Sequence, residues 1–271
     1  MIPTVSKIQL SQYTLPVSKE IGLVENILQN LVHSLAIDGS KSNTLDSYKL
    51  PDRNLYAALI LLTYKSLKTE PDDVVNSQLV QLASIMEFIH YAIFIHNEIM
   101  DDELGQTKYD FNTKNRISVL IGDILYTQAF FSASLSLPGH LSQVISNLTQ
   151  NMCLAEIKEE MYNDAQFSLE KYLEIAREKT AVFFGACSRI ASSLATSDEN
   201  IIKEFEKFGL NLGMIFQYKL DSSFKHKATP EFLDSNILNS FISEAKTSID
   251  FLGDSVYKEN LLELVNYISN F

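Results

Sequence analysis

The stretch Glu-Phe-Ile-His-Tyr-Ala-Ile-Phe-Ile-His-Asn-Glu-Ile-Met-Asp-Asp, residues 87–102, is the most informative part of the sequence for the fold. It belongs to a run that is almost wholly apolar from Ile85 to Ile95, and this pattern predicts a helix buried in a core. The helix is then expected to end among acidic side chains. Carboxylates at a helix C-terminus oppose the helix dipole, so this ending favours a bound cation or another functional reason for the acids.

The rest of the chain also favours long helices. Its 9 glycines and 6 prolines in 271 residues are about half the usual number. Apolar residues recur at spacings of three and four, without a convincing alternating strand. The sequence therefore predicts an all-α bundle of long, roughly antiparallel helices in a single domain over residues 1–271. We expect helices at residues 17–36, 52–68, 72–102, 113–136, 140–163, 168–195, 198–224, 231–251 and 255–269, with polar connections at 38–51 and 103–112.

Charge and composition exclude several classes of protein. The net charge of −12, with no basic patch, opposes binding to nucleic acid or to an anionic bilayer. The longest uncharged run, 124–155, is interrupted by Pro138 and Gly139, so we expect no transmembrane segment. The first residues lack a secretory signal pattern. Cys153 and Cys187 lie in apolar helical sequence, which predicts buried, reduced thiols in a cytoplasmic protein.

The acids at the end of the opening stretch form a candidate metal site. Glu98, Asp101 and Asp102 stand at positions i, i+3 and i+4, so their carboxylates share one helix face and suit a hard cation such as Mg²⁺. Taken alone, such a cluster is more often a solvated helix end. His90 and His96 are six residues apart and do not share a face, which favours core or rim histidines.

Two further features lie later in the chain. Gly209 and Gly213 stand four residues apart within an apolar helical segment, where small residues let another helix come close. Lys179 and Thr180 interrupt the apolar stretch 172–190. The lysine is either an anion contact or a surface lysine whose stem covers apolar groups.

The order of these features resembles the trans-isoprenyl diphosphate synthase family, also called polyprenyl synthetases. The family's first acidic motif is Glu-x-x-His, then five residues, then His-Asp-Asp-x-x-Asp, and residues 87–101 match its register without a gap. The other family landmarks are matched, in the family's order, by Leu120-Ile-Gly-Asp123, Glu156-Ile157, Glu178-Lys-Thr-Ala181, Phe208-Gly209 to Gly213 and Phe216-Gln217. The resemblance covers roughly residues 50–271.

The resemblance implies a helical bundle around a central cavity and a Mg²⁺-dependent reaction. In the family, an allylic diphosphate ionises on Mg²⁺ and the carbocation is attacked by isopentenyl diphosphate. The implied catalytic residues are Lys179, Thr180 and Gln217, which are either vestigial or in contact with a diphosphate. The implied substrate-binding residues are Arg53, Phe88, His90, Ala92 and Ile93. Ala92 and Ile93 occupy the positions that set product length in the family, so we expect a deep apolar cavity along this helix.

The sequence departs from the family at both acidic motifs. Asn97 and Glu98 replace two aspartates, and the second motif keeps only Asp221, with Leu220 and Phe224 at the other acidic positions. The implied metal ligands are Glu98, Asp101, Asp102 and Asp221, with Mg²⁺ bound at reduced occupancy or absent. The basic side is also reduced, because Arg53 is the only cation where the family has Gly-Lys-x-x-Arg.

These losses predict a polyprenyl-synthetase-like protein that is non-catalytic or weakly active. Its role would be that of a subunit which pairs with an active trans-prenyl diphosphate synthase, and which forms a homodimer when isolated. An active prenyltransferase and an isoprenoid-binding protein without chemistry are the alternatives. The helix expected at 113–136 has more apolar residues than one core-facing stripe needs, so we expect it at the interface, although full burial in the bundle would give the same pattern.

Overall fold

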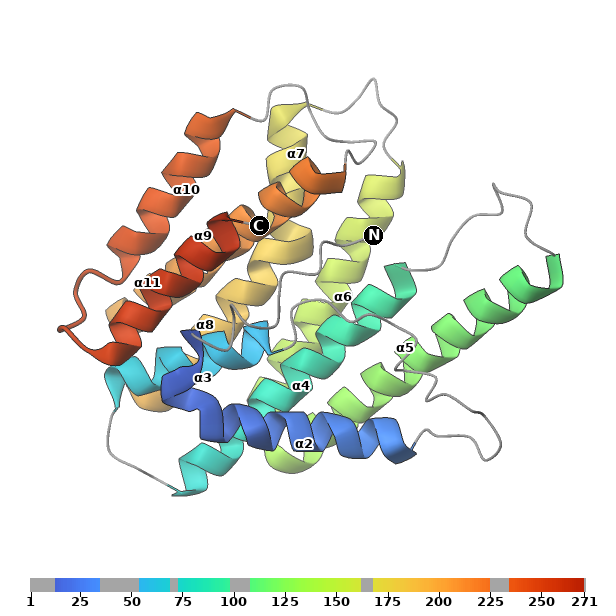
Figure 1. Cartoon of the computed structure of the whole chain (residues 1–271), viewed down its shortest axis with the longest axis horizontal. Helices are drawn as coiled ribbons and strands as arrows, with labels where there is room; N and C mark the ends of the chain where they lie inside the picture. Colours follow the sequence, from blue (N-terminus) through green and yellow to red (C-terminus); the bar gives the residue numbers. More distant parts are fainter. Residues whose placement is uncertain are drawn as a thin grey trace.

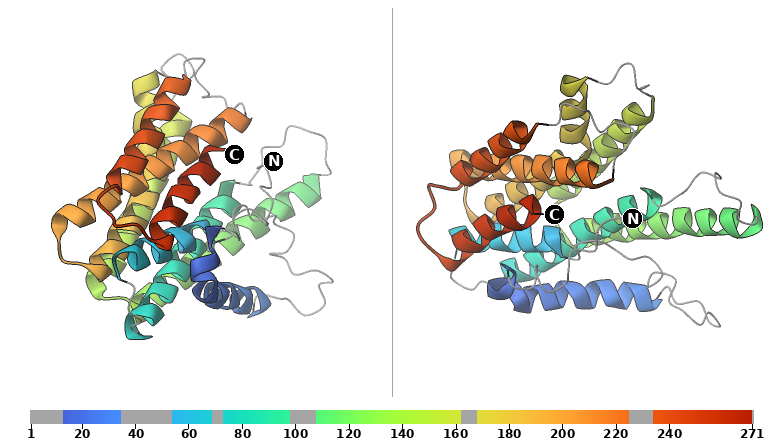
Figure 2. Two further views of the ribbon diagram at one scale, coloured as in Figure 1. Left: turned by 60° about the vertical axis from the view of Figure 1, so that its left-hand side comes forward. Right: turned by 45° about the horizontal axis from the view of Figure 1, so that its top comes forward.

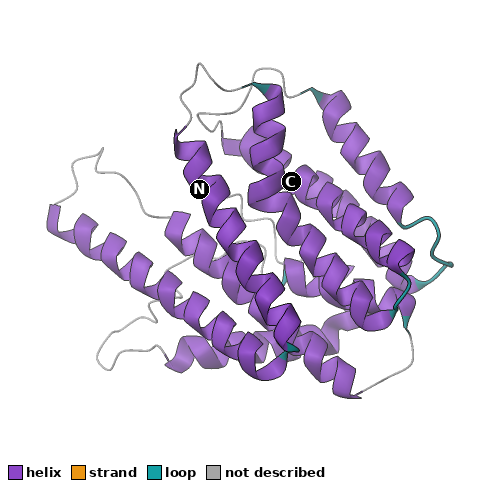
Figure 3. Ribbon diagram, turned by 180° about the vertical axis from the view of Figure 1, so that it is seen from behind, coloured by secondary structure: helices purple, strands orange, loops and turns teal. Residues whose placement is uncertain are grey.

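The computed structural model describes residues 13–34, 54–68, 73–97, 108–161, 168–224 and 234–270. These ranges contain helices and no strand, which confirms the all-α prediction (Figure 3). The elements are η1 (Leu15–Val17), α2 (Ser18–Ser34), α3 (Leu55–Leu67), α4 (Asp73–Asn97), α5 (Lys108–Ser136), α6 (Gly139–Met161), α7 (Leu169–Ala176), η4 (Arg177–Ala181), α8 (Val182–Ala195), α9 (Glu199–Phe224), α10 (Ser235–Ser248) and α11 (Val256–Ser269).

Two elements differ from the sequence-based expectation. Helix α5 begins at Lys108, so the second half of the connection expected at 103–112 is helical. The helix expected at 168–195 is interrupted by η4, a π-helical turn that joins α7 to α8. The spacing of apolar residues does not reveal such a turn, because a π-helical turn adds one residue to the helix and leaves the buried face apolar. π-Turns within α-helices occur frequently at functional sites, which directs attention to Lys179 and Thr180 within it.

Helix α3 lies at the centre of the bundle and is buried on every side. It packs against α4, α8 and α11, and also contacts α2. Its ten consecutive residues from Leu55 to Tyr64 are all buried, as expected of a helix that is apolar around its whole circumference. Figure 1 shows α10 and α11 on one side of the bundle and α5 on the other, and Figure 2 shows the N-terminal part of α5 projecting from it.

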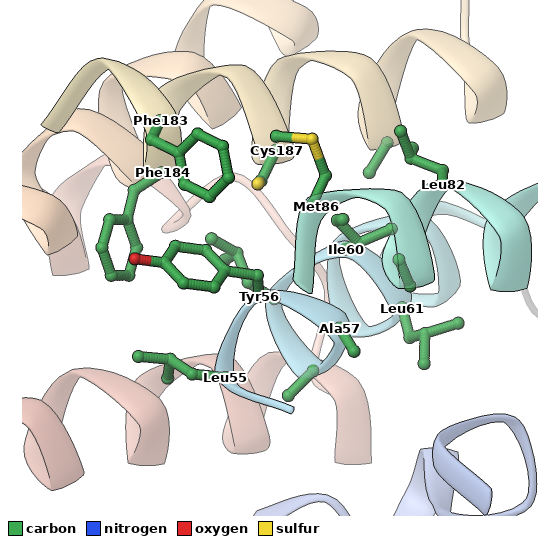
Figure 4. Packing of buried hydrophobic residues seen from close by; sticks show 14 of the residues in the cluster. Leu55, Tyr56, Ala57, Ile60, Leu61, Leu82, Met86, Phe183, Phe184 and Cys187 are labelled. Atoms are coloured by element: carbon green, nitrogen blue, oxygen red, sulfur yellow. The ribbon is translucent and has the colours of Figure 1, made fainter. Parts of the chain in front are cut away.

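Aromatic and sulfur-containing side chains fill the contact between α3 and α8. The ring of Tyr56 lies 4.7 Å from that of Phe183 and 4.8 Å from that of Phe184, centroid to centroid (Figure 4). Cys187 is buried near Met86, which confirms the prediction for this thiol. The same prediction was wrong for Cys153, which lies on the outer face of α6 and is exposed.

Helices α8 and α9 approach each other so closely that only glycine fits at two positions of α9. A Cβ atom on Gly209 would lie 2.3 Å from the carbonyl oxygen of Phe184, and one on Gly213 would lie 2.6 Å from the Cα atom of Ala181. Real Cβ atoms essentially never come this near to backbone atoms. The two glycines therefore act as the sequence predicted, by letting another helix come close.

Helices α5 and α6 carry a large set of exposed apolar side chains, which we call the α5–α6 surface. It consists of Ile117, Val119, Leu120, Ile124, Phe131 and Leu135 on α5 and Val144, Leu154, Ile157 and Met161 on α6. By length and composition alone, residues 75–97 and 115–136 could each cross a membrane. The first segment is 72% buried inside the bundle and the second only 33%. The expected absence of a transmembrane segment therefore stays a prediction.

The α8–α9 contact makes a direct prediction for stability. Gly209→Ala is expected to lower the free energy of unfolding by about 1–3 kcal/mol, because the backbone of Phe184 must move to admit the methyl group. Gly22 in α2 has open space where its Cβ would lie, so Gly22→Ala is the matched control and is expected to stabilise by about 0.5–1 kcal/mol. Urea unfolding followed by circular dichroism measures both. Equal shifts for the two variants would contradict the close packing.

Candidate functional site

Part of the predicted site lies outside the described residues. The predicted metal ligands Glu98, Asp101 and Asp102 follow the last described residue of α4, and Arg53 immediately precedes Asn54. Their roles stay predictions. The site is therefore built from the C-terminal part of α4, the π-helical turn η4 and the facing parts of α6, α7 and α9.

The C-terminal turn of α4 is held against α5 and α6. The Nε2 atom of His96 is 3.2 Å from the carbonyl oxygen of Val119 and 3.6 Å from a carboxylate oxygen of Asp123. Asn97 donates a hydrogen bond of 3.2 Å from Nδ2 to Glu156. His96 is thus a rim histidine, one of the two alternatives that the sequence favoured.

The residues expected along a substrate channel lie on α4. Phe88 and Ala92 are buried in the main core cluster and Ile93 packs partly buried against it. His90 is partly exposed as a residue, but its ring centroid lies 4.8 Å from that of Tyr56. Burial of the ring lowers the pKa of His90 to about 4, so the imidazole is neutral near pH 7. The apolar cavity and the substrate contacts stay predictions.

Glu87 joins α4 to the first turn of α3 inside the core. Its Oε1 atom accepts a 3.0 Å hydrogen bond from the backbone nitrogen of Ala57, one of the amides that the helix itself leaves unpaired. Asn54, which precedes this turn, has a left-handed backbone (φ 72°), and its side chain makes no hydrogen bond that caps the helix. The carboxyl group of Glu87, from another helix, supplies the cap instead. Complete burial raises the pKa of Glu87 to about 7, although hydrogen bonding from the α3 backbone and from Tyr91 opposes the shift.

Two of the three predicted diphosphate-contacting residues, Thr180 and Gln217, meet Asp221 in one hydrogen-bonded chain. Thr180 in η4 donates to the side-chain oxygen of Gln217 in α9 at 2.5 Å. Gln217 donates from Nε2 to Oδ1 of Asp221 at 2.9 Å, and the hydroxyl of Tyr172 in α7 donates to Oδ2 of Asp221 at 2.8 Å. The sequence predicted three of these four residues, Thr180, Gln217 and Asp221, as site residues. Both oxygens of Asp221 are already hydrogen-bonded within the protein.

Lys179 in η4 points to a different neighbour. Its Nζ atom forms an ion pair with Oε2 of Glu159 in α6 at 2.7 Å. Burial pulls the pKa of Lys179 down, but the carboxylates of Glu159, Glu156 and Asp221 outweigh this effect and the pKa is raised. Lys179 is therefore a charged, largely buried side chain with an internal counter-ion. This ion pair disfavours the alternative of a surface lysine whose stem covers apolar groups.

The second acidic motif does not fit a metal site of the kind the resemblance implies. Asp221 is its only carboxylate, because Leu220 takes one of the acidic positions and the other is Phe224. Its two oxygens accept hydrogen bonds from neutral donors. Among the residues that the structure describes, no group of three or more histidine, cysteine, aspartate or glutamate side chains is placed to hold a metal ion.

Sequence reasoning missed three members of this region: Tyr172, Glu159 and Glu87 as a helix cap. Each acts through a contact between residues 20 to 49 positions apart. Glu159 had one local signal, because it lies with Glu156, Lys158 and Glu160 at the end of a helix that is uncharged before them. Tyr172 had none beyond its apolar context.

The sequence is similar to a family of known proteins. A family model described as polyprenyl synthetase matches residues 45–223. A prenyl transferase of Cyanophora paradoxa is 28% identical over 211 residues, which are 74% of this chain and 63% of that protein. An octaprenyl diphosphate synthase of Haemophilus influenzae is 24% identical over 235 residues, which are 84% of this chain and 69% of that protein. The matched part of this chain thus spans about two thirds of the length of these relatives.

Solved structures show the same fold. A polyprenyl synthase from Caulobacter crescentus, complexed with calcium and isoprenyl diphosphate, has a TM-score of 0.74 at 18% identity and covers 96% of this chain and 98% of its own. A decaprenyl diphosphate synthase from Rhodobacter capsulatus has a TM-score of 0.72 at 17% identity, with the same coverage. At this identity, the likeness concerns the arrangement of helices.

The buried carboxyl of Glu87 predicts a pH dependence of stability. The folded protein keeps this proton up to about pH 7, whereas the unfolded chain loses it near 4.5, so stability falls as the pH rises between these values. The shift corresponds to a loss on the order of 3 kcal/mol. Glu87→Gln removes the titrating group, so the variant should lose less stability than the wild type between pH 5 and pH 8.

Urea unfolding at the two pH values measures this difference. Glu204→Gln, on the exposed face of α9, is the control and should follow the wild type. If Glu87→Gln showed the same pH dependence as the wild type, the raised pKa would be wrong.

Proposed function

We propose that this chain, which belongs to the polyprenyl synthetase family, is a non-catalytic or weakly active subunit that associates with an active trans-prenyl diphosphate synthase. Its candidate ligand is an isoprenoid diphosphate. The observation that carries the proposal is the internal hydrogen bonding of Asp221, the one carboxylate kept at the second acidic motif.

Metal-assisted ionisation of a diphosphate needs carboxylates that face the metal, since the metal ions stabilise the charge that develops on the leaving group. Here the Gln217 amide and the Tyr172 hydroxyl occupy the oxygens of Asp221. A metal at this point would share these oxygens with both donors and would find no second carboxylate of this motif, because Leu220 and Phe224 stand at the other acidic positions. A single carboxylate holds Mg²⁺ weakly.

An active Mg²⁺-dependent prenyltransferase is the second candidate, and specific residues favour it. Lys179, Thr180 and Gln217 are kept, and Thr180 and Gln217 are directly hydrogen-bonded. The relatives described above are a prenyl transferase and an octaprenyl diphosphate synthase. A third candidate, an isoprenoid-binding protein without chemistry, needs the apolar cavity predicted along α4.

The α5–α6 surface supports association. Three apolar residues of α5, Leu120, Ile124 and Phe131, are exposed, whereas Ile121 and Leu125 are buried and Phe130 is partly buried. Helix α5 therefore packs one apolar face against the core and exposes a second apolar face. The alternative that its apolar residues are all buried in the bundle does not hold. Exposed apolar side chains gathered on one helix face in this way are typical of protein interfaces. A cytoplasmic location and the absence of a membrane anchor stay predictions.

An assay of prenyl transfer separates the subunit from the enzyme. The purified protein is incubated with Mg²⁺, radiolabelled isopentenyl diphosphate and allylic primers, first alone and then with a prenyl synthase encoded near it. We expect little or no incorporation by the protein alone, and a change in the rate or product length of the active synthase when it is added. Robust turnover by the protein alone, abolished by Lys179→Ala, would establish the second candidate instead.

Light scattering tests the proposed interface. We expect the isolated protein to form a homodimer of the 30.6 kDa chain at micromolar concentration. Phe131→Asp places a charge on the α5–α6 surface and should weaken association by at least tenfold, because an unpaired carboxylate would be buried at the contact. Val256→Asp introduces the same charge at an exposed position of α11, on the opposite side of the bundle, and should leave the mass unchanged (Figure 1). A wild-type monomer, unchanged by candidate synthases, would overturn the subunit proposal.

A further inference from the structure

Two lysine–glutamate pairs of opposite orientation join η4 to α6. In one, Lys179 of η4 meets Glu159 of α6 at 2.7 Å, and in the other, Lys158 of α6 meets Glu178 of η4 at 2.6 Å. The lengths are similar but the surroundings differ. The side chains of the first pair are 20% and 17% exposed, and those of the second are 47% and 37% exposed.

This difference in exposure changes what each pair does. An exposed ion pair is screened by water and contributes little. A shielded pair interacts strongly, and removing one partner leaves the other charge desolvated and uncompensated. Three carboxylates, those of Glu159, Glu156 and Asp221, act on the ammonium group of Lys179. Its charge is thus already balanced within the protein.

We propose that Glu159 is an internal counter-ion which occupies the ammonium group of Lys179 and opposes the binding of a diphosphate there. The inference deepens the proposed function and rests on it, because it concerns the same ligand. An incoming diphosphate must replace the Glu159 carboxylate on Nζ and also approaches its negative charge. Both effects lower the affinity of Lys179 for the diphosphate.

Lys179 and Thr180, which are adjacent in the π-helical turn, have separate partners. Successive residues of η4 project to different helices: Lys179 reaches α6, whereas Thr180 reaches Gln217 on α9. The lysine and the threonine are thus held apart by separate partners. Glu159 makes no hydrogen bond to the Thr180–Gln217–Asp221–Tyr172 chain, so a substitution at Glu159 removes none of its hydrogen-bond partners, although Asp221 also acts on Lys179 through its charge.

The test is the substitution Glu159→Gln, which removes the charge and keeps the size and one acceptor oxygen. Isothermal titration calorimetry with inorganic pyrophosphate, in Mg²⁺ buffer, should show about tenfold tighter binding than the wild type, the effect of one charge-assisted contact. Glu178→Gln removes the same charge from the exposed pair on the same two elements. This control should change the affinity by no more than about twofold.

The double variant Glu159→Gln/Lys179→Gln shows whether the gain acts through Lys179, and it should lose the gain. Circular dichroism verifies that each variant is folded. If Glu159→Gln does not fold, Glu159→Asp withdraws the carboxylate by one methylene and should give a smaller gain in the same direction. Geranyl diphosphate is titrated in parallel: a gain with both ligands supports an isoprenoid diphosphate, and a gain with pyrophosphate alone supports free diphosphate.

The outcomes separate this inference from the proposed function. If the wild type and Glu159→Gln bind pyrophosphate equally well, or if Glu178→Gln gives the same gain, the counter-ion role is wrong and the proposed ligand stands. Binding by Glu159→Gln but not by the wild type supports the inference most strongly. If no variant binds either ligand, the diphosphate site itself is wrong, and the proposed function loses its ligand.

Discussion

Close contact between α9 and the α8–η4 segment is the constraint on which the candidate site depends. Gly209 and Gly213 remove the side chains that would keep the two backbones apart. One turn beyond Gly213, the same contact brings Gln217 within hydrogen-bonding distance of Thr180. Hydrogen bonds between two helices require their donor and acceptor atoms to be placed to within a fraction of an ångström. The close packing at the two glycines fixes the helices at this distance without using any polar side chain.

The polar groups of the site are paired mainly with one another. Asp221 is held by Gln217 and Tyr172, and Lys179 is held by Glu159. Such an arrangement is stable without a ligand, because each shielded charge has a partner. A site built for turnover instead keeps charged groups directed at the reacting atoms. The pairing seen here is the arrangement that the proposed subunit role requires.

The sequence predicted the parts of the molecule that depend on local patterns. Helical periodicity located the long helices to within a few residues at most ends, and the spacing of Gly209 and Gly213 predicted their role. Contacts between distant segments were harder to foresee. The amide cap that Glu87 supplies to α3 and the pairing of Lys179 with Glu159 depend on how the helices pack, which no local pattern encodes. The π-helical turn was missed because it leaves the apolar periodicity nearly intact.

Cys153 stands on the outer face of α6, where its neighbours affect its reactivity towards oxidants. Partial burial and the negative charge of Glu156 raise the pKa of the Cys153 thiol, although hydrogen bonding with Tyr126 counteracts this. The nucleophilic form of a cysteine is the thiolate, so near neutral pH a smaller fraction of this thiol is reactive than in a cysteine with the ordinary pKa. If two copies met through this face, the raised pKa would slow the formation of a disulfide between them.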